Sequence, residues 1–465
     1  MARRPNIILI LADDMGYGDF GAFNDNHGAD TPALDALVAD GVTLRQHYSG
    51  SPVCAPARAA LMTGRYPHRT GAIDTYDARG LDRLALRERT MADVLRDAGY
   101  ATGLVGKWHL GAIDPRYHPN ARGFDEFAGF RGGWQDYYQW HLDRNGVFEK
   151  ADGRYLTDVF TDEAVSFVKC HASGAKPFFL HVTYNAPHWP YQCPDEDLDY
   201  FRQRGCTEGQ AMIYGMIRRM DQGITKIMEE VRRHGAEDDT IVLFTSDNGP
   251  DLFEVLGVDV KRYNLGFHGA KTWVYEGGIR VPMVVRWPGG GVDGGRFIDD
   301  IAHFTDWLPT LASTAGAQVP TDRAIDGCNI LPTLRGEGPV DNVVRYWQWN
   351  RWTPCIESNA AIRDGDWKLV RPKIAETFQM PDGEGELDSR LKYEPESFDR
   401  VIPLTGFERE IPPPPPAELY NIADDPCETR NLADADPQRF SRMLGDLNAW
   451  FEGVEAERAT IDDVW

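Results

Sequence analysis

The chain has few cysteines, and no two of them are spaced as Cys-x-x-Cys. The seven cysteines lie at positions 54, 170, 193, 206, 328, 355 and 427. Disulfide-stapled small folds and thiolate zinc sites need paired or closely spaced cysteines. An odd, scattered set favours neither, so we expect most of these residues to be small members of the core.

Positive charge is also scarce. Lys and Arg number 49 against 72 Asp and Glu, which gives a net charge of −23. A field of that sign repels polyanions, so we expect no nucleic-acid partner and no membrane partner. Any anion that binds this chain needs a local pocket of cationic side chains.

Long apolar runs are absent from the start of the chain. The first apolar stretch covers only residues 7–12 and then meets Asp13 and Asp14. It is too short for a signal peptide or a membrane span. The sequence as given therefore predicts a cytoplasmic protein, or a periplasmic one if a signal was removed.

What the chain does contain is an alternation of short apolar runs with segments of helical period. The expected strands are residues 7–11, 101–105, 178–183, 241–245 and 281–287. The expected helices are residues 31–41, 90–99, 157–171, 210–234 and 303–315. This pattern predicts an α/β fold whose central sheet is mixed, mostly parallel and sandwiched by helices.

The sequence pattern changes near residue 336, where short aromatic-rich stretches such as residues 345–349 appear among turns. We interpret residues 1–335 as a large α/β catalytic domain. We interpret residues 336–465 as a smaller C-terminal α+β domain with an antiparallel sheet. The five prolines at 412–416 predict a surface connection within it.

Polar residues follow four of the expected strands. In chain order they are Asp13 and Asp14, Lys107 and His109, Asn185 and His188, and Asp247 and Asn248. Ligands of open α/β sheets bind beyond the carboxyl ends of the strands, so we expect these side chains to meet at one edge.

Neighbouring carboxylates raise each other's pKa unless a cation compensates them. Asp13, Asp14, Asp247 and the amide oxygen of Asn248 form an all-oxygen set that suits calcium or magnesium better than zinc. Either pair taken alone could instead be a helix cap or a turn.

Cys54 precedes the helix-prone residues 59–62, and Arg58 follows it one turn later. A helix N-terminus and a nearby guanidinium lower a thiol pKa, which would make Cys54 a nucleophile. The alternative is a cysteine that is simply buried.

Lys107, His109, His188 and Lys271 could together bind a tetrahedral oxyanion and supply a general acid and base. Singly, such residues are more often solvated surface groups. The aromatic residues form two clusters in the sequence, and these could stack on sugar rings or pack as a core. They are Trp134, Tyr137, Tyr138 and Trp140, and Trp347, Trp349 and Trp352.

The stretch from Cys54 to Arg58, followed by Thr63-Gly64-Arg65, resembles the C-x-P-x-R signature and T-G-R extension of the type I sulfatases, in the alkaline phosphatase superfamily. Further stretches match in family order and cover nearly the whole chain: residues 6–14, 106–109, 186–188, 246–249, 271–278, 363–369 and 418–421. One departure is that Ala55 and Ala57 replace the Ser or Thr and the Ser common in the family.

The resemblance implies a sulfuric ester hydrolase. It implies that a formylglycine-generating enzyme oxidises Cys54 to formylglycine, whose hydrate attacks sulfur. It further implies that Asp13, Asp14, Asp247 and Asn248 hold calcium, with magnesium or manganese as alternatives, and that the modified Cys54 also contacts the metal.

The remaining roles follow from the same resemblance. Arg58 and Lys107 steady the modified side chain, and Lys107, His188 and Lys271 contact the sulfate. His188 and Lys271 also help to protonate the leaving alcohol, and His109 deprotonates the hydrate to expel sulfate.

We expect a sulfated saccharide as substrate, with Trp134 contributing to its binding and small aryl sulfates turned over as surrogates. One alternative keeps the machinery but acts on phosphonate monoesters or phosphodiesters. Another is a non-catalytic saccharide-binding protein on the same scaffold.

Overall fold

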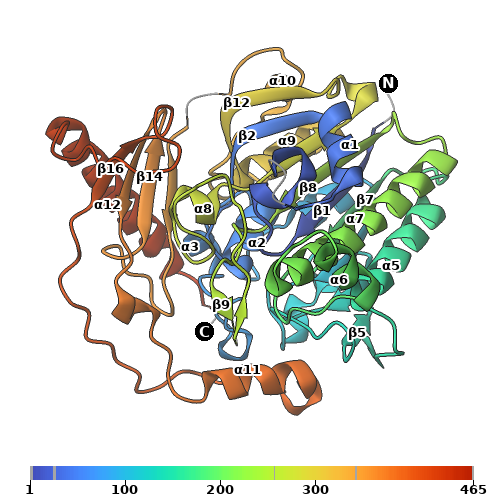
Figure 1. Ribbon diagram of the computed structural model, residues 1–465, viewed down its shortest axis with the longest axis horizontal. Helices are drawn as coiled ribbons and strands as arrows, with labels where there is room; N and C mark the ends of the chain where they lie inside the picture. Colours follow the sequence, from blue (N-terminus) through green and yellow to red (C-terminus); the bar gives the residue numbers. More distant parts are fainter. Residues whose placement is uncertain (1–3, 25–27, 256, 341–342, 463–465) are drawn as a thin grey trace.

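The computed structural model describes residues 4–24, 28–255, 257–340 and 343–462 (Figure 1). Within them, ten strands form one sheet in the order β12-β2-β11-β8-β1-β7-β3-β4-β5-β6. Their bounds are β1 Asn6–Ala12, β2 Val42–Tyr48, β3 Ala101–Lys107, β4 Glu126–Phe130, β5 His141–Arg144, β6 Val147–Lys150, β7 Phe178–Thr183, β8 Thr240–Ser246, β11 Met283–Arg286 and β12 Arg296–His303. The run from β8 to β4 is parallel, β2 and β12 are parallel to each other, and β11, β5 and β6 pair antiparallel with their neighbours. The predicted mixed, mostly parallel sheet is confirmed.

Helices cover both faces of this sheet. One face packs against α1 Pro32–Asp40, α5 Leu156–His171, α6 Asp195–Arg202 and α7 Glu208–Arg233. The other packs against α2 Cys54–Thr63, α4 Met91–Asp97, α9 Trp307–Ala315 and α10 Leu331–Leu334. In β1, Ile8 and Ile10 face the first helical layer, while Ile7 and Leu9 face the second. Because both faces are buried, the strand reads as a continuous apolar run.

The C-terminal part contains a second, antiparallel sheet in the order β13-β14-β15-β16. Its strands are β13 Arg345–Gln348, β14 Ala360–Asp364, β15 Trp367–Arg371 and β16 Glu418–Asn421. The helix α12 Pro437–Arg458 covers one face of this sheet. The other face packs against Tyr48 at the end of β2 and against Ile279, which precedes β11. A long connection between β15 and β16 carries α11 Glu384–Tyr393, which lies well away from the small sheet at the bottom of Figure 1. The prolines at 412–416 lie exposed on this connection, as predicted.

The smaller elements are α3 Pro67–Thr70, α8 Glu276–Ile279 and the hairpin of β9 Glu254–Val255 with β10 Val258–Asp259. Short 3-10 helices lie at Tyr17–Asp19, Gly21–Phe23, Asp77–Arg79, Pro115–Tyr117, Pro119–Ala121, Pro288–Gly290, Phe304–Asp306, Ala375–Phe378 and Pro395–Ser397. Among the described residues, no helix is both long and apolar enough to cross a bilayer.

Two expectations about the elements need correction. The helix expected at residues 303–315 begins only at Trp307, because His303 is the last residue of β12 and a 3-10 turn follows it. The sequence analysis also missed β2, β4, β5, β6 and β12. Several of these strands expose polar side chains, and all of β6 is exposed, so they lack the apolar run that marks a central strand.

Candidate active site

The carboxyl ends of four neighbouring parallel strands bring the predicted site residues together. The last residues of β1 and β8, Ala12 and Ser246, are register partners, so Asp13 and Asp247 emerge side by side. The backbone N–H of Asp247 donates to the carbonyl of Ala12 at 3.1 Å. Beside them, β3 ends at Lys107 and the loop after β7 carries His188.

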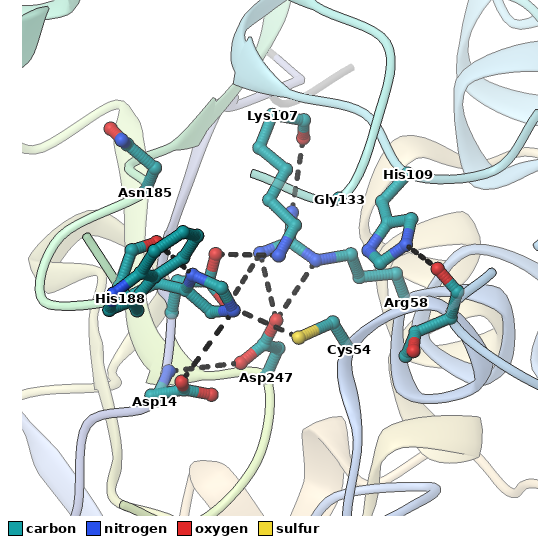
Figure 2. Close-up of polar contacts among 12 residues, drawn as sticks. Asp14, Cys54, Arg58, Lys107, His109, Gly133, Asn185, His188 and Asp247 are labelled. Carbon is teal, nitrogen blue, oxygen red and sulfur yellow. Dashed lines mark hydrogen bonds and ion pairs between the residues drawn. The ribbon is translucent and has the colours of Figure 1, made fainter. Parts of the chain in front are cut away.

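Cys54 is the first residue of α2, and its thiol points at this edge of the sheet. Its Sγ lies 3.4 Å from Oδ1 of Asp13, and Figure 2 shows the sulfur among Asp14, Asp247 and Lys107. Burial raises the pKa of the Cys54 thiol well above its usual value, and the charges of Asp13 and Asp247 raise it further. The expected lowering of this pKa was therefore wrong. The helix N-terminus is outweighed, and Arg58 is paired with Asp247 rather than with the sulfur.

Three cations contact the buried carboxylates: Arg58, which is paired with Asp247, and two lysines. Nζ of Lys107 donates to Asp13 at 2.6 Å, and Nζ of Lys271 donates to Asp14 at 2.6 Å. Burial alone would raise the pKa of Asp14, but Lys271, followed by His188, holds that pKa well below its usual range. By contrast, burial and the charge of Asp13 raise the pKa of Asp247 to about 6. The carboxylates are thus crowded even with three cations present.

The donor set fits a hard metal ion. Asp13, Asp14, Cys54 and His188 each offer one ligand atom, and these atoms all lie within 4.8 Å of one another. Nδ2 of Asn248 donates to Asp14 at 2.8 Å, while its Oδ1 is buried and has no hydrogen-bond partner among the residues described above. An orphaned amide oxygen beside carboxylates is what a hard cation would satisfy. The sequence analysis did not place His188 in this group.

His188 sits between the carboxylates and a supporting loop. Its Nε2 lies 3.8 Å from Oδ2 of Asp14, and its Nδ1 lies 2.5 Å from the carbonyl of Trp189. Burial, followed by the charge of Lys271, lowers the pKa of His188 well below its usual value. The hydroxyl of Tyr137 donates to the carbonyls of Asn185 and His188 at 2.7 and 3.0 Å, which fixes this loop.

His109 approaches from the opposite side of Cys54 (Figure 2). Its Nε2 lies 3.0 Å from Oδ1 of Asp77 and 3.1 Å from the carbonyl of Thr75. Its Nδ1 is buried and has no hydrogen-bond partner within the part of the chain that the structure describes. Burial lowers the pKa of His109, although the charge of Asp77 opposes the effect. His109 and Asp14 both adopt φ values in the left-handed region, 57° and 67°, which are uncommon for residues other than glycine and concentrate at functional sites.

A pocket of about 260 Å³, which we call the active-site pocket, opens above this cluster. Among its lining residues are Cys54, His109, Trp134, His188 and Lys271. Further lining residues that the sequence analysis missed are Thr75, Tyr76, Trp189, Arg351, Glu384 and Asp388. Trp189 directly follows His188 after the expected strand 178–183, so its position could have marked it. The other five follow no expected strand and belong to no recognised motif, so no sequence signal marked them.

Comparison with known proteins places this chain in a family. Residues 5–317 match the family model described as Sulfatase. The chain belongs to the sulfatase family. It is therefore a sulfuric ester hydrolase of the alkaline phosphatase superfamily, and the family resemblance found in the sequence is confirmed. Residues 265–389 of this sulfatase also match a model described as N-sulphoglucosamine sulphohydrolase, C-terminal.

Individual relatives cover most of this sulfatase. The uncharacterized sulfatase YdeN of Escherichia coli (strain K12) is 31% identical over 504 residues, which are 97% of this chain and 86% of that protein. Human N-acetylgalactosamine-6-sulfatase is 34% identical over 369 residues, which are 74% of this chain and 68% of that protein. The crystal structure of Ps i-CgsB in complex with k-i-k-neocarrahexaose superposes with a TM-score of 0.81 and 31% identity, covering 96% of this chain and 93% of that one.

The aromatic clusters of this sulfatase divide between the pocket and the core. Trp134 lines the active-site pocket, and its ring meets that of Trp189 edge-on with centroids 4.5 Å apart. The exposed Tyr138 and the buried Tyr137 both pack on Tyr155. The other members are buried: Trp140, Trp347, Trp349 and Trp352. Packing explains most of both clusters, and Trp134 is the member placed to meet a ligand.

Proposed function

We propose that this sulfatase hydrolyses a sulfate ester carried by a saccharide, with formylglycine made from Cys54 as its nucleophile and calcium as its metal. The single observation that carries the proposal is the position of Cys54. Its Sγ lies 3.4 Å from Asp13 and also lines a pocket flanked by Lys271, His188 and His109. A nucleophile there touches the metal site and the substrate pocket at once.

Asp13, Asp14, Asp247 and Asn248 would hold the metal, with the modified Cys54 side chain and His188 beside it. When bound, calcium supplies positive charge against which a sulfuryl oxygen can be polarised. The orphaned Oδ1 of Asn248 and the unrelieved crowding at Asp247 support this assignment. Magnesium or manganese would suit the carboxylates as well, and metal titration distinguishes the three.

The cations at the pocket would bind the sulfate. Lys271 is only partly buried, with 15% of its side chain exposed, so its ammonium can face both Asp14 and a ligand. Lys107 is fully buried and contacts Asp13, which suits it to steady the nucleophile together with Arg58. Donors fixed in advance around developing negative charge lower the barrier without reorganisation, typically by a factor of about 100 to 1,000 each.

Two histidines on opposite sides of Cys54 would handle the protons. When formylglycine is present, its hydrate would supply the hydroxyl whose oxygen attacks sulfur; that hydroxyl would lose its proton to a neighbouring carboxylate, and the ester oxygen would leave with the electron pair of the S–O bond. Lys271 and His188 would together supply the proton that this alcohol needs, and the lowered pKa of His188 makes the ammonium of Lys271 the charged member of the pair. His109 would then accept the proton of the second hydroxyl as sulfate departs with the electron pair of the carbon–oxygen bond, which restores the aldehyde.

A saccharide is supported by two further observations. Trp134 and Trp189 present aromatic surface at the pocket, as sugar rings favour. Among the relatives, one is named for a sulfated N-acetylgalactosamine and another was crystallised with a carrahexaose.

The experiment measures sulfate release from a panel of defined sulfated mono- and oligosaccharides and from an aryl sulfate and an aryl phosphonate. Protein co-expressed with a formylglycine-generating enzyme should release sulfate, and its intact mass should show the modified Cys54. Cys54→Ala should release none while keeping its melting temperature, and Cys170→Ala, at an exposed cysteine, should behave like the native protein.

A clear preference for the phosphonate would favour the alternative chemistry. The phosphonate monoester hydrolase of Agrobacterium radiobacter shares the fold at a TM-score of 0.61, but at 22% identity that likeness concerns the fold alone. Saccharide binding without turnover by fully modified protein would instead favour the non-catalytic alternative.

A further inference from the structure

The two ring nitrogens of His109 lie in different surroundings. Nε2 hydrogen-bonds to the carbonyl of Thr75 at 3.1 Å and makes an ion-pair contact of 3.0 Å with Oδ1 of Asp77, and both of these neighbours are acceptors. Nδ1 has no hydrogen-bond partner among the described residues, although it is buried. In Figure 2 this second nitrogen lies on the side of the ring that faces Cys54 and Arg58.

We propose that Asp77 is a positioning residue that, beside the carbonyl of Thr75, keeps the proton of His109 on Nε2, so that Nδ1 is the atom that accepts the proton, and that Lys392 of α11 keeps Asp77 in place. This inference rests on the proposed function and extends it. A carboxylate close to one imidazole nitrogen favours a proton on that nitrogen and stabilises the imidazolium that forms.

The surroundings of Asp77 suit a fixed anion. Its Oδ2 accepts from the backbone N–H of Gly133 at 2.8 Å and from Nζ of Lys392, while its Oδ1 faces His109. Asp77 is 1% exposed, and only 3% of the Lys392 side chain is exposed. A cation and a backbone N–H that both donate to one oxygen of a buried carboxylate hold it in one orientation, with its other oxygen toward His109.

The pKa of the nearby acid Asp82 is affected by the negative charge of Asp77. Burial, and then the charge of Asp77, raises the pKa of Asp82 to about 8. Burial would also raise the pKa of Asp77, but Lys392, followed by His109, holds that pKa well below its usual range. Of these two acids, only Asp77 is therefore mainly an anion at neutral pH. The charged groups that act on His109 are Asp77, Lys107 and Lys392.

Gly133 closes the other side of the imidazole. A Cβ atom at this position would lie 2.8 Å from both Cε1 and Nε2 of His109, so no larger residue fits without displacing the ring. The same glycine donates to Asp77 through its backbone. The ring is thus held between a backbone surface and a carboxylate.

Lys392 comes from α11, in the connection between two strands of the small sheet. Two contacts hold this helix at the pocket: Glu384 pairs with Arg79, and Asp388 accepts from Nε1 of Trp134 at 2.6 Å. The C-terminal part of the chain therefore completes the setting of His109.

The first test replaces Asp77 by Asn, which keeps the shape and removes the charge. We expect kcat to fall about 100-fold or more, because proton transfer by a positioned base contributes on that scale, and KM to fall with it, so that kcat/KM changes little, because only the step after alcohol release is slowed. With an aryl sulfate, a burst of alcohol should remain while steady release of sulfate slows, because His109 acts after the alcohol has left. An equal loss of burst and steady state would indicate a damaged site and overturn the inference.

A double-mutant cycle separates a positioning role from an independent one. If Asp77 acts through His109, then His109→Ala and the double variant His109→Ala/Asp77→Asn should have the same kcat. Additive losses would overturn the inference. Nitrogen NMR of the native protein with labelled histidine tests the tautomer without any substitution. It should show His109 protonated at Nε2, and protonation at Nδ1 would contradict the inference.

Variants of α11 test the role of Lys392. Lys392→Met should lower kcat, and the loss should grow as the pH falls, because Asp77 then protonates more easily; Lys392→Arg should restore most of the rate. The matched control is Arg390→Gln on the same helix, since Arg390 stacks on Phe398 and should not affect turnover. Native protein that releases no sulfate would overturn the proposed function and this inference with it, whereas native turnover in Asp77→Asn would overturn the inference alone.

Discussion

Arg58 and Asp247 are joined by two hydrogen bonds to a single oxygen. Nε and Nη2 of Arg58 donate to Oδ2 of Asp247 at 3.0 and 2.8 Å, and Nη1 donates to the carbonyl of Lys107 at 3.0 Å. Because Arg58 lies one turn after Cys54, this fork fastens the first turn of α2 to the ends of β8 and β3. The position of Cys54 over the carboxylates follows from that attachment.

Metal binding should stabilise the folded protein. The carboxylates of Asp13, Asp14 and Asp247 are crowded and buried, so an ion that binds only the folded state should raise the melting temperature. At a free calcium concentration 1,000 times the Kd, the gain in unfolding free energy would be about 4 kcal/mol. Thermal melts with calcium and with a chelator measure the shift.

The control for that prediction is Asp14→Asn, which removes one charged ligand. Its melting temperature should respond far less to calcium than that of the native protein. A native protein whose melting temperature is the same with calcium and with chelator would argue against a metal at this cluster, provided that elemental analysis shows the chelated sample to be metal-free.

Lys271→Met should lower kcat/KM for a sulfate ester by about 100- to 1,000-fold, because it removes one fixed cation beside the reacting group. It also leaves the buried Asp14 without its ammonium partner at 2.6 Å, so the metal-free variant should melt lower than the native protein. Lys261→Met, at an exposed lysine, is the matched control and should change neither quantity. Steady-state kinetics and melts test this together, and an Lys271→Met enzyme with native kcat/KM would refute it.

Lys368 should be a stability determinant rather than a catalytic one. Its Nζ contacts Glu276 at 2.9 Å and Glu428 at 2.8 Å, and all three side chains are buried. Lys368→Met leaves two buried acids without their cation, and we expect it to cost about 3 to 5 kcal/mol. Chemical denaturation measures this cost.

A second variant checks the electrostatic cause. Burial and the charge of Glu276 outweigh Lys368 and raise the pKa of Glu428 to about 7. Removing that acid as well, in Lys368→Met/Glu428→Gln, should recover part of the loss. If the double variant is less stable than the single one, lost packing rather than unpaired charge is the explanation.

Asp221 should make the protein less stable as the pH rises through the mildly acidic range. Its carboxylate accepts from the backbone N–H groups of Ala33 and Leu34 at 3.0 and 2.9 Å, and burial raises its pKa from 3.8 to about 6. An acid whose pKa is higher in the folded state stabilises the fold fully below its unfolded pKa. That stability is lost as the pH rises from about 4 to about 6, and the loss is on the order of 2 to 3 kcal/mol.

Asp221→Asn should remove this contribution, because an amide does not titrate. The difference in unfolding free energy between native and variant should therefore change between pH 4 and 6 and stay constant above it. Asp322→Asn, at an exposed aspartate, should give a difference that does not vary with pH. A constant difference for Asp221→Asn would show that its pKa is not shifted.

The sequence by itself determined the buried parallel strands at the centre of the sheet and the polar residues that follow them. A strand buried on both faces must be apolar throughout, so β1, β3, β7 and β8 were visible as runs. Parallel neighbours end at the same edge, so polar residues after those runs had to meet. The motif around Cys54 indicated a sulfatase and therefore the hydrolysis of sulfate esters.

Only the tertiary structure decided which partner each of these groups has. The pKa of Cys54 is raised because carboxylates surround it once the chain has folded, although its local helix position predicts the opposite. Asp77 and Lys392 are separated by more than 300 residues and belong to no strand-end pattern, so nothing local marked either as a neighbour of His109. Burial and charge depend on contacts across the whole chain, whereas apolar period and motif spacing are local. The sequence therefore determined the buried apolar strands and the motif residues, and the fold determined the electrostatics.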